Sequence, residues 1–198
     1  VKSRSVEGYP WPEVRVHGWI AASPKEVMAV YADFESQAGY LPNLVESRIV
    51  KQVSRNAFHV AYEYEVTGPN ERYTVLAAVG RSSRSLQVTW DLVEARYARR
   101  LSGWMRVEPS GSGALVEYAN RVDPGFFGVT LGSPETTSRQ LQETVQALAA
   151  YVQRLRTAQR EKLRTLTDTL HSMLGEPKDL GRLDDSPVPL VSIGVSRC

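Results

Sequence analysis

One stretch of this 198-residue chain constrains the fold more than any other, the stretch from Thr136 to about Leu166. It contains neither Pro nor Gly, and a weaker continuation reaches Leu174 before Gly175 ends it. Its apolar residues are spaced by four, three, four and three positions, at Leu141, Val145, Leu148, Val152 and Leu155. This spacing places them on one side of a helix. A long helix with one apolar side requires a broad apolar surface to lie on.

The chain before this helix alternates between apolar and polar residues, which predicts strands. After the first alternating segment, Ser23 and Glu26 have the spacing of a capping box, and Pro follows Ser23 directly. They predict a helix over 24–34, and a second short helix with a turn follows over 37–44. Six further strands lie between residues 45 and 122, separated by short turns rich in Gly, Pro, Asn and Ser. Short turns between strands indicate an antiparallel meander.

Composition and charge exclude several classes of protein. The 24 Lys and Arg residues nearly balance the 22 Asp and Glu residues, so we expect no nucleic-acid partner. No apolar run has the length of a membrane span, so we expect no transmembrane segment and a soluble protein. The compartment stays open between the cytoplasm and, if Val1 follows a removed signal peptide, the periplasm. The oligomeric state is also open.

The expected organisation has three parts. Residues 1–12 are an extended lead-in, and residues 13–166 form one domain with the strands and the long helix. Residues 167–198 are a helical extension and a loose tail, because this segment contains Pro177, Pro187 and Pro189 and few large apolar residues.

Three motifs carry a resemblance to a known group of proteins. Residues 20–27 read Ile-Ala-Ala-Ser-Pro-Lys-Glu-Val, and Ala-Asp-Phe-Glu at 32–35 and Tyr-Leu-Pro at 40–42 follow them. Asp-Pro-Gly at 123–125 comes before the long helix. Over roughly residues 13–160 the chain resembles the SRPBCC superfamily, which includes START-like and polyketide cyclase/dehydrase-like helix-grip proteins.

The resemblance implies an α+β helix-grip fold. In this fold a curved seven-stranded antiparallel sheet wraps around a long C-terminal helix, with two short helices after strand 1. A large internal cavity lies between the sheet and the helix. The motifs specify a capped helix and a sheet corner, and they do not specify a reaction.

The inward positions of the strands carry large side chains that are not uniformly apolar. Tyrosines with an apolar body and a polar tip suit a cavity for an apolar molecule with a few oxygens, although they can also be core residues bonded to the backbone. Phe126 and Phe127 lie between glycines, and we expect them to form either a gate beside the long helix or a hydrophobic plug. The predicted ligand-binding residues are Tyr62, Tyr64, Tyr73, Trp90, Met105, Tyr118, Asn120, Phe126, Phe127, Leu141, Val145 and Leu148.

We predict no catalytic residue, no metal site and no cofactor. The spacing of the three histidines, His17, His59 and His171, gives no sign that they converge on a metal. The carboxylates of Glu63 and Glu65 fall on the predicted solvent face of their strand. Arg121 and Asp123 are expected near the cavity mouth, where a salt bridge and a turn cap are simpler interpretations than ligand contacts. Whether the protein is an enzyme is left uncertain, and the sequence favours a non-enzyme.

Three functions remain open at this point. The first is binding or transport of a hydrophobic small molecule, such as a lipid, an isoprenoid or a polyketide-like compound. The second is a polyketide cyclase, aromatase or dehydratase-type enzyme that uses the same cavity. The third is an interaction module that docks through the long basic helix, with transient membrane contact as one form of it. An open apolar interior favours the first, an open interior with a buried ionisable pair the second, and a filled interior the third.

Overall fold

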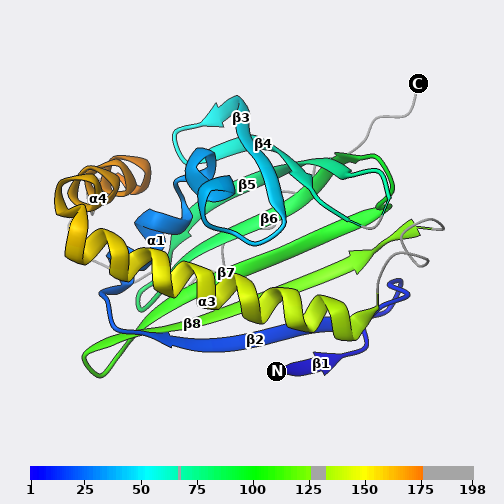
Figure 1. The fold of residues 1–198 in the computed structure, drawn as a ribbon, viewed down its shortest axis with the longest axis horizontal. Coiled ribbons are helices and arrows are strands. Elements are labelled where there is room, and N and C mark those ends of the chain that lie inside the picture. The colour runs from blue at the N-terminus through cyan, green and yellow to red at the C-terminus, as the bar shows by residue number, and fades with distance from the viewer. Residues whose placement is uncertain (67, 126–132, 176–198) are drawn as a thin grey trace.

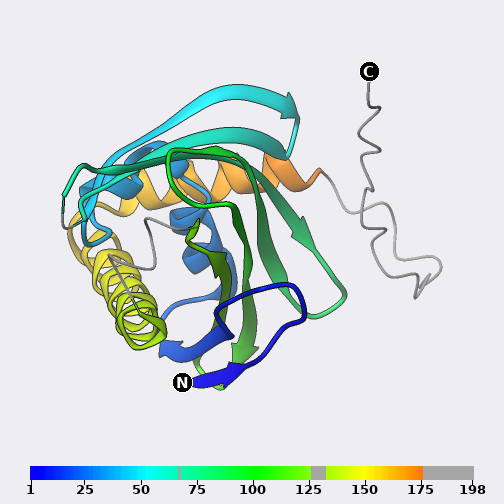
Figure 2. The ribbon, with the colours of Figure 1, turned by 90° about the vertical axis from the view of Figure 1, so that its right-hand side faces the viewer.

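The structure is a computed structural model, and it describes residues 1–66, 68–125 and 133–175. One antiparallel sheet of eight strands, in the order β1-β2-β8-β7-β6-β5-β4-β3, curves around helix α3 (Figures 1 and 2). The strands are β1 (Lys2–Arg4), β2 (Glu13–Ile20), β3 (Leu44–Ser54), β4 (Ala57–Tyr64), β5 (Glu71–Arg81), β6 (Leu86–Ala95), β7 (Arg100–Ser110) and β8 (Gly113–Asp123). The helices are α1 (Pro24–Tyr31), the 3₁₀ helix η1 (Phe34–Gly39), α3 (Pro134–Ala158) and α4 (Arg160–Leu174). The expected α+β helix-grip fold is confirmed.

The strand count differs from the expected seven because the lead-in contributes a strand. β1 pairs antiparallel with the edge of β2, with Lys2 opposite Arg15 and Arg4 opposite Glu13. Its three residues are exposed and polar, so no alternation of apolar side chains reveals it in the sequence. Backbone hydrogen bonds to an otherwise unpaired edge stabilise such a strand.

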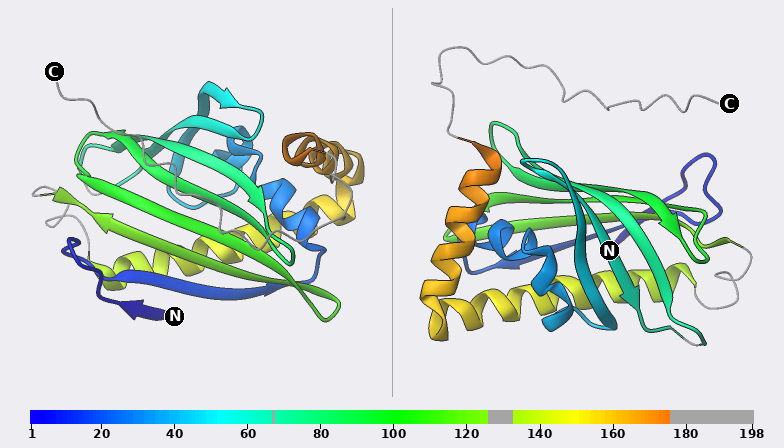
Figure 3. Two further views of the ribbon diagram at one scale, coloured as in Figure 1. Left: turned by 180° about the vertical axis from the view of Figure 1, so that it is seen from behind. Right: turned by 90° about the horizontal axis from the view of Figure 1, so that it is seen from above.

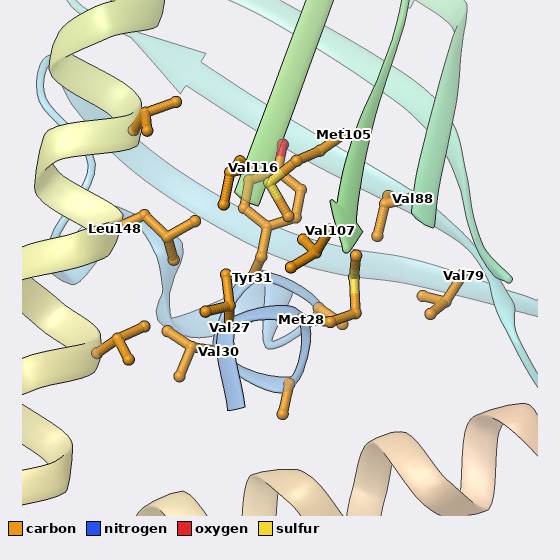
Figure 4. Close-up of a cluster of buried hydrophobic side chains, with 14 of the residues drawn as sticks. Val27, Met28, Val30, Tyr31, Val79, Val88, Met105, Val107, Val116 and Leu148 are labelled. Carbon is orange, nitrogen blue, oxygen red and sulfur yellow. The ribbon is translucent and has the colours of Figure 1, made fainter. Parts of the chain in front are cut away.

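Helix α1 begins where the capping box predicts. The Ser23 hydroxyl accepts a hydrogen bond from the Glu26 backbone N–H at 3.3 Å, and the Ser23 N–H donates to the Glu26 carboxylate at 2.8 Å. The apolar side chains of α1 are buried between Leu148 of α3 and the inner face of the sheet (Figure 4). The hydrophobic core therefore lies at the C-terminal half of α3.

The two short helices are shorter than expected. α1 ends at Tyr31 instead of 34, and η1 covers Phe34–Gly39 instead of the expected 37–44. Phe34 is buried in the core, which draws the start of η1 toward α1. Asn43 has a left-handed φ of 59°, which no helix accommodates, so the chain turns into β3 there.

The expected single helix from 136 to 166 is two helices. At Gln159 the backbone leaves the helical region, with φ −141° and ψ 50°, and α4 then runs in a different direction across the end of the sheet (Figure 3). The change of direction lets Leu163 and Leu170 of α4 pack into the core beside α1. The expected domain boundary at residue 166 falls inside α4, and this boundary stays a prediction.

The register of the sheet identifies the inner face of β8, which alternation alone leaves ambiguous. Tyr118 lies opposite Val16 of β2, and Asn120 lies opposite Val14. Residues directly opposite each other in an antiparallel pair share one face of the sheet. Val14 and Val16 are buried core residues, so Tyr118 and Asn120 also face inward.

The outer face of the same two strands holds a buried carboxylate. The Glu13 side chain is 1% exposed and accepts hydrogen bonds from the Nε atoms of Arg15 and Arg121, each at 2.5 Å. Arg121 therefore forms a salt bridge on the outer face and is not at the cavity mouth. The carboxylate of Asp123 accepts a hydrogen bond from the Gly125 N–H at 3.0 Å, as a turn cap does.

The Glu13 cluster predicts acid sensitivity. Burial raises the pKa of Glu13, but the hydrogen bonds and charges of Arg15 and Arg121 outweigh burial and hold it below the usual 4.5. Because the folded-state pKa is the lower one, this stabilisation is present above pH 4.5 and is lost as pH falls through the folded value. We expect Glu13→Gln to be less stable than the wild type at pH 7 and to lose less stability on acidification, measured by urea unfolding. Glu46→Gln, which alters an exposed pair with Arg48, is the control. Parallel acid curves for wild type and Glu13→Gln would contradict the prediction.

The packing of α4 predicts that its second half contributes to folding. Leu170 is 2% exposed, and replacing it with Ala leaves a cavity in the core. We expect Leu170→Ala to lower the free energy of unfolding by about 2–5 kcal/mol. Thr169→Ala, at the exposed neighbouring position, is expected to change it by less than about 0.5 kcal/mol. Equal unfolding curves for the two variants would show that the domain ends before Leu170.

Candidate functional site

A cavity of about 260 Å³ lies between the N-terminal half of α3 and the inner face of the sheet. The cavity lies next to the hydrophobic core around α1. Inward residues of β4, β5, β6 and β8 form most of its wall, and Tyr31 of α1 and Gln37 of η1 close one side. Thr137 and Leu141 of α3 contribute to the opposite side. The interior is therefore open at one end of α3 and filled at the other.

Three tyrosines from two neighbouring strands form one part of the wall. Tyr62 and Tyr64 lie two residues apart on β4, and Tyr73 of β5 is directly opposite Tyr62. The ring centroids of Tyr62 and Tyr73 are 5.6 Å apart. The rings of Tyr64 and Tyr73 are stacked, with centroids 5.8 Å apart and planes at 9°. This tyrosine cluster presents flat aromatic faces to the cavity.

A second aromatic group joins α1 to the middle of the sheet. The centroid of the Trp90 ring lies 5.1 Å from that of Tyr118, and the Tyr31 hydroxyl donates to the Tyr118 hydroxyl at 3.2 Å. The indole of Trp90 lies over Gly103 of β7, where an added Cβ would be 2.5 Å from Trp90 Cζ2. A glycine inside a strand is a sequence signal for such a close approach. Gly103 was not among the residues predicted at the site.

Gln37 connects the two aromatic groups. Its side chain is 2% exposed, and its Nε2 donates to the carbonyl oxygen of Tyr31 at 2.8 Å. Its Oε1 accepts a hydrogen bond from the Tyr62 hydroxyl at 2.9 Å. Both ends of this buried amide are satisfied, so the tyrosine cluster and α1 hold each other in position.

Asn120 carries an unsatisfied acceptor on the cavity wall. Its Oδ1 is the one buried side-chain nitrogen or oxygen without a hydrogen-bond partner in the described parts of the chain. An unpaired buried acceptor is costly, and a donor from a ligand or a water molecule would remove that cost.

The buried tyrosines stay protonated at physiological pH. Burial raises the pKa of Tyr31, Tyr62 and Tyr73 well above 10, and it raises the pKa of Tyr64 to about 12. The pKa of Tyr118 also rises because of burial. A neutral phenol donates and accepts hydrogen bonds, but it is a poor base near neutral pH.

Glu71 is a cavity-lining carboxylate that sequence analysis missed. It lies opposite Tyr64 in the β4–β5 pair, and one of its oxygens accepts a hydrogen bond from the Tyr97 backbone N–H at 3.2 Å. Burial raises its pKa, while N–H groups of the turn at 96–98 and the charge of Arg96 act in the opposite direction. Glu71 is two residues before Tyr73, so strand alternation alone was sufficient to predict that it faces inward.

The structure separates the predicted ligand-binding residues into groups. Met105 and Leu148 are 0% and 1% exposed and fill the core. Val145 packs against Gly18 of β2 and lines a second depression between β2 and α3. Phe126 and Phe127 lie outside the described residues. The remaining predicted residues line the cavity, and they are Tyr62, Tyr64, Tyr73, Trp90, Tyr118, Asn120 and Leu141.

The histidines lie away from the cavity and from one another. His17 and His59 are on the outer face of β2 and β4, and His171 is in α4. In residues 1–66, 68–125 and 133–175, no three His, Cys, Asp or Glu side chains gather as metal ligands do.

Comparison with known proteins identifies the fold and the family. Human STARD10 is similar, with a TM-score of 0.69 at 12% identity over 88% of this chain and 77% of that chain. The STAR-related lipid transfer protein from Xanthomonas axonopodis has a TM-score of 0.65 at 19% identity, over 76% and 91%. The Zhui aromatase/cyclase from Streptomyces has a TM-score of 0.58 at 17% identity, over 74% and 96%. No curated protein matches the chain.

These structural similarities, all below 20% identity, concern the fold. A family model described as polyketide cyclase / dehydrase and lipid transport matches residues 12–153, which run from the start of β2 through most of α3. This range contains nearly all the residues that line the cavity. The chain therefore belongs to the polyketide cyclase / dehydrase and lipid transport family.

Proposed function

We propose that this protein binds a hydrophobic small molecule in the cavity and acts as its carrier or sensor. The observation that carries the proposal is the cavity of about 260 Å³, walled by aromatic rings and left open at one end of α3. Moving apolar ligand surface from water into such a site is favourable by about 25 cal/mol per Å², before the costs of ordering the ligand. The description of the family and the name of the Xanthomonas neighbour refer to lipid transport and lipid transfer, and they are consistent with the proposal.

A cyclase, aromatase or dehydratase is the competing function. The family description and the Zhui aromatase/cyclase support it by analogy of fold. Such chemistry requires groups that exchange a proton near the working pH. The tyrosines of the wall have raised pKa values and do not exchange protons near neutral pH. Glu71, a carboxylate whose pKa burial raises, is therefore the better candidate for that role. Binding needs no proton transfer, so an aromatic wall with protonated tyrosines supports binding more directly than catalysis.

Docking through the basic helix receives less support. Arg156 donates to the carbonyl oxygen of Ala21 and pairs with Glu26 at 3.4 Å. Lys162 donates to the Tyr151 hydroxyl at 3.0 Å, and the guanidinium of Arg154 lies 4.6 Å from the centroid of the same ring. Arg156 thus holds α3 to the segment around α1, and Lys162 joins α4 to α3. Among the described helices, none has the length and apolar character needed to span a membrane.

Native mass spectrometry of gently purified protein tests the proposal. We expect a bound apolar molecule at near-stoichiometric amount, recovered and identified after organic extraction. A mass of the protein alone, together with no uptake of fluorescent fatty-acid, sterol or naphthalene probes, would contradict the proposal. Conversion of a bound compound during incubation would favour the cyclase alternative.

A substitution that fills the cavity gives a matched test. Ala77 of β5 is buried on the cavity wall, opposite Trp90, so Ala77→Phe places a ring in the ligand's space. We expect at least a tenfold loss of ligand affinity, with a change in the free energy of unfolding below about 3 kcal/mol. The readout is ligand titration beside thermal unfolding. Ala78→Phe, the next residue on the outer face of the strand, is expected to retain binding. Retained binding in Ala77→Phe would place the ligand elsewhere.

A further inference from the structure

The charged residues of the cavity wall are all of one sign. Glu65 and Glu71 line the cavity, and no Lys, Arg or His of the described chain is among the lining residues. A ligand anion would lose its hydration in this cavity and find no opposite charge to compensate.

Glu71 lies beside the stacked tyrosines. It is directly opposite Tyr64 across the β4–β5 ladder and two residues before Tyr73 on its own strand, so all three face the cavity. A carboxylate and aromatic faces both attract cations, the first by its charge and the second by the negative face of the ring.

The carboxylate of Glu71 has backbone partners but no ion-pair partner. It accepts the Tyr97 N–H, and the salt bridges of the described residues do not include it. The nearby guanidinium of Arg96 donates instead to the carbonyl oxygen of Asn70 at 3.4 Å, and it lies 5.2 Å from the centroid of the Tyr97 ring. The charge of Arg96 acts on Glu71 without a direct ion pair, so this half-buried carboxylate still gains when a cation from a ligand arrives.

The unpaired Oδ1 atom of Asn120, which also lies on the cavity wall, favours the same kind of ligand. Asn120 Oδ1 is an acceptor, so a ligand with an N–H or O–H group can donate a hydrogen bond to it. A carboxylate oxygen would be repelled. Glu71 and Asn120 Oδ1 therefore both favour a ligand that donates hydrogen bonds or carries positive charge.

We infer that the cavity selects an apolar, ring-containing ligand that carries a protonated amine, with Glu71 and the faces of Tyr64 and Tyr73 holding the positive charge. The inference rests on the proposed function and adds the chemical class of the ligand to it. It distinguishes this cavity from a site built for fatty acids or other carboxylates.

Three probes with one naphthalene body and different charges test the inference. They are 2-naphthylmethylamine, 2-naphthylmethanol and 2-naphthoate, titrated calorimetrically at pH 7 into the full chain. We expect the amine to bind at least tenfold more tightly than the carboxylate, with the neutral alcohol between them. Added salt should weaken binding of the amine and leave binding of the alcohol nearly unchanged, because only the amine gains from charge attraction.

Variants assign the preference to Glu71. Glu71→Gln keeps an acceptor for the Tyr97 N–H and removes the charge, so we expect roughly a tenfold loss of amine affinity and little change for the alcohol. Glu63→Gln, on the outer face of β4 between two cavity tyrosines, should leave all three affinities unchanged. Thermal unfolding of both variants checks that they are folded, and the salt dependence of the wild type stands if Glu71→Gln does not fold.

The outcomes separate the inference from the proposed function. If the carboxylate binds as tightly as the amine, or if Glu71→Gln weakens all three probes equally, the inference is overturned and the cavity remains a binding site. If none of the probes binds, the proposed function fails together with the inference.

Discussion

The insertion of α1 between α3 and the sheet is the contact on which the rest of the structure depends. Val27 and Val30 face Leu148 of α3, while Met28 faces Val79 and Val88 of the sheet (Figure 4). These side chains separate one end of α3 from the sheet by the thickness of a helix. The N-terminal half of α3 extends past α1, and a space remains between this half and the sheet. That space becomes the cavity.

The cavity stays open because its wall side chains bond to one another instead of filling it. Gln37 links Tyr62 to the backbone of Tyr31, and Tyr31 in turn donates to Tyr118. A tyrosine that swung inward to fill the space would leave a buried amide or hydroxyl unpaired, at a cost of about 1–3 kcal/mol. The same hydrogen bonds that stabilise the domain therefore preserve a preformed site, which lowers the cost of ordering it when a ligand binds.

Strand alternation predicted the inward face of β4, β5 and β6, but it left β8 ambiguous and gave no position along the strand. Tyr62, Tyr73 and Trp90 face inward and line the cavity, whereas Met105 also faces inward and lies in the core. The same limit applies to α3, where Leu141 and Leu148 share one side of the helix. Leu141 lines the cavity, whereas Leu148 lies in the core. The distance of a residue from α1 decides whether it lies in the core or on the cavity wall. The periodicity of the sequence gives no information about that distance. Glu71 was missed for another reason: the alternation of β5 was followed only from Tyr73 onward, and Glu71 lies two residues before it with the same parity.

The charge of Glu71 links the type of ligand to the type of function. A cation bound beside this carboxylate would lower its pKa, against the effect of burial, and keep it ionised. An ionised carboxylate with a fixed counter-ion binds well but is a weaker proton donor and acceptor. A cavity that holds an amine through Glu71 thus gives up a half-buried carboxylate that a cyclase could use, whereas a cavity for a neutral polyketide would leave it free to titrate. Charge selectivity and catalysis are competing uses of the same side chain.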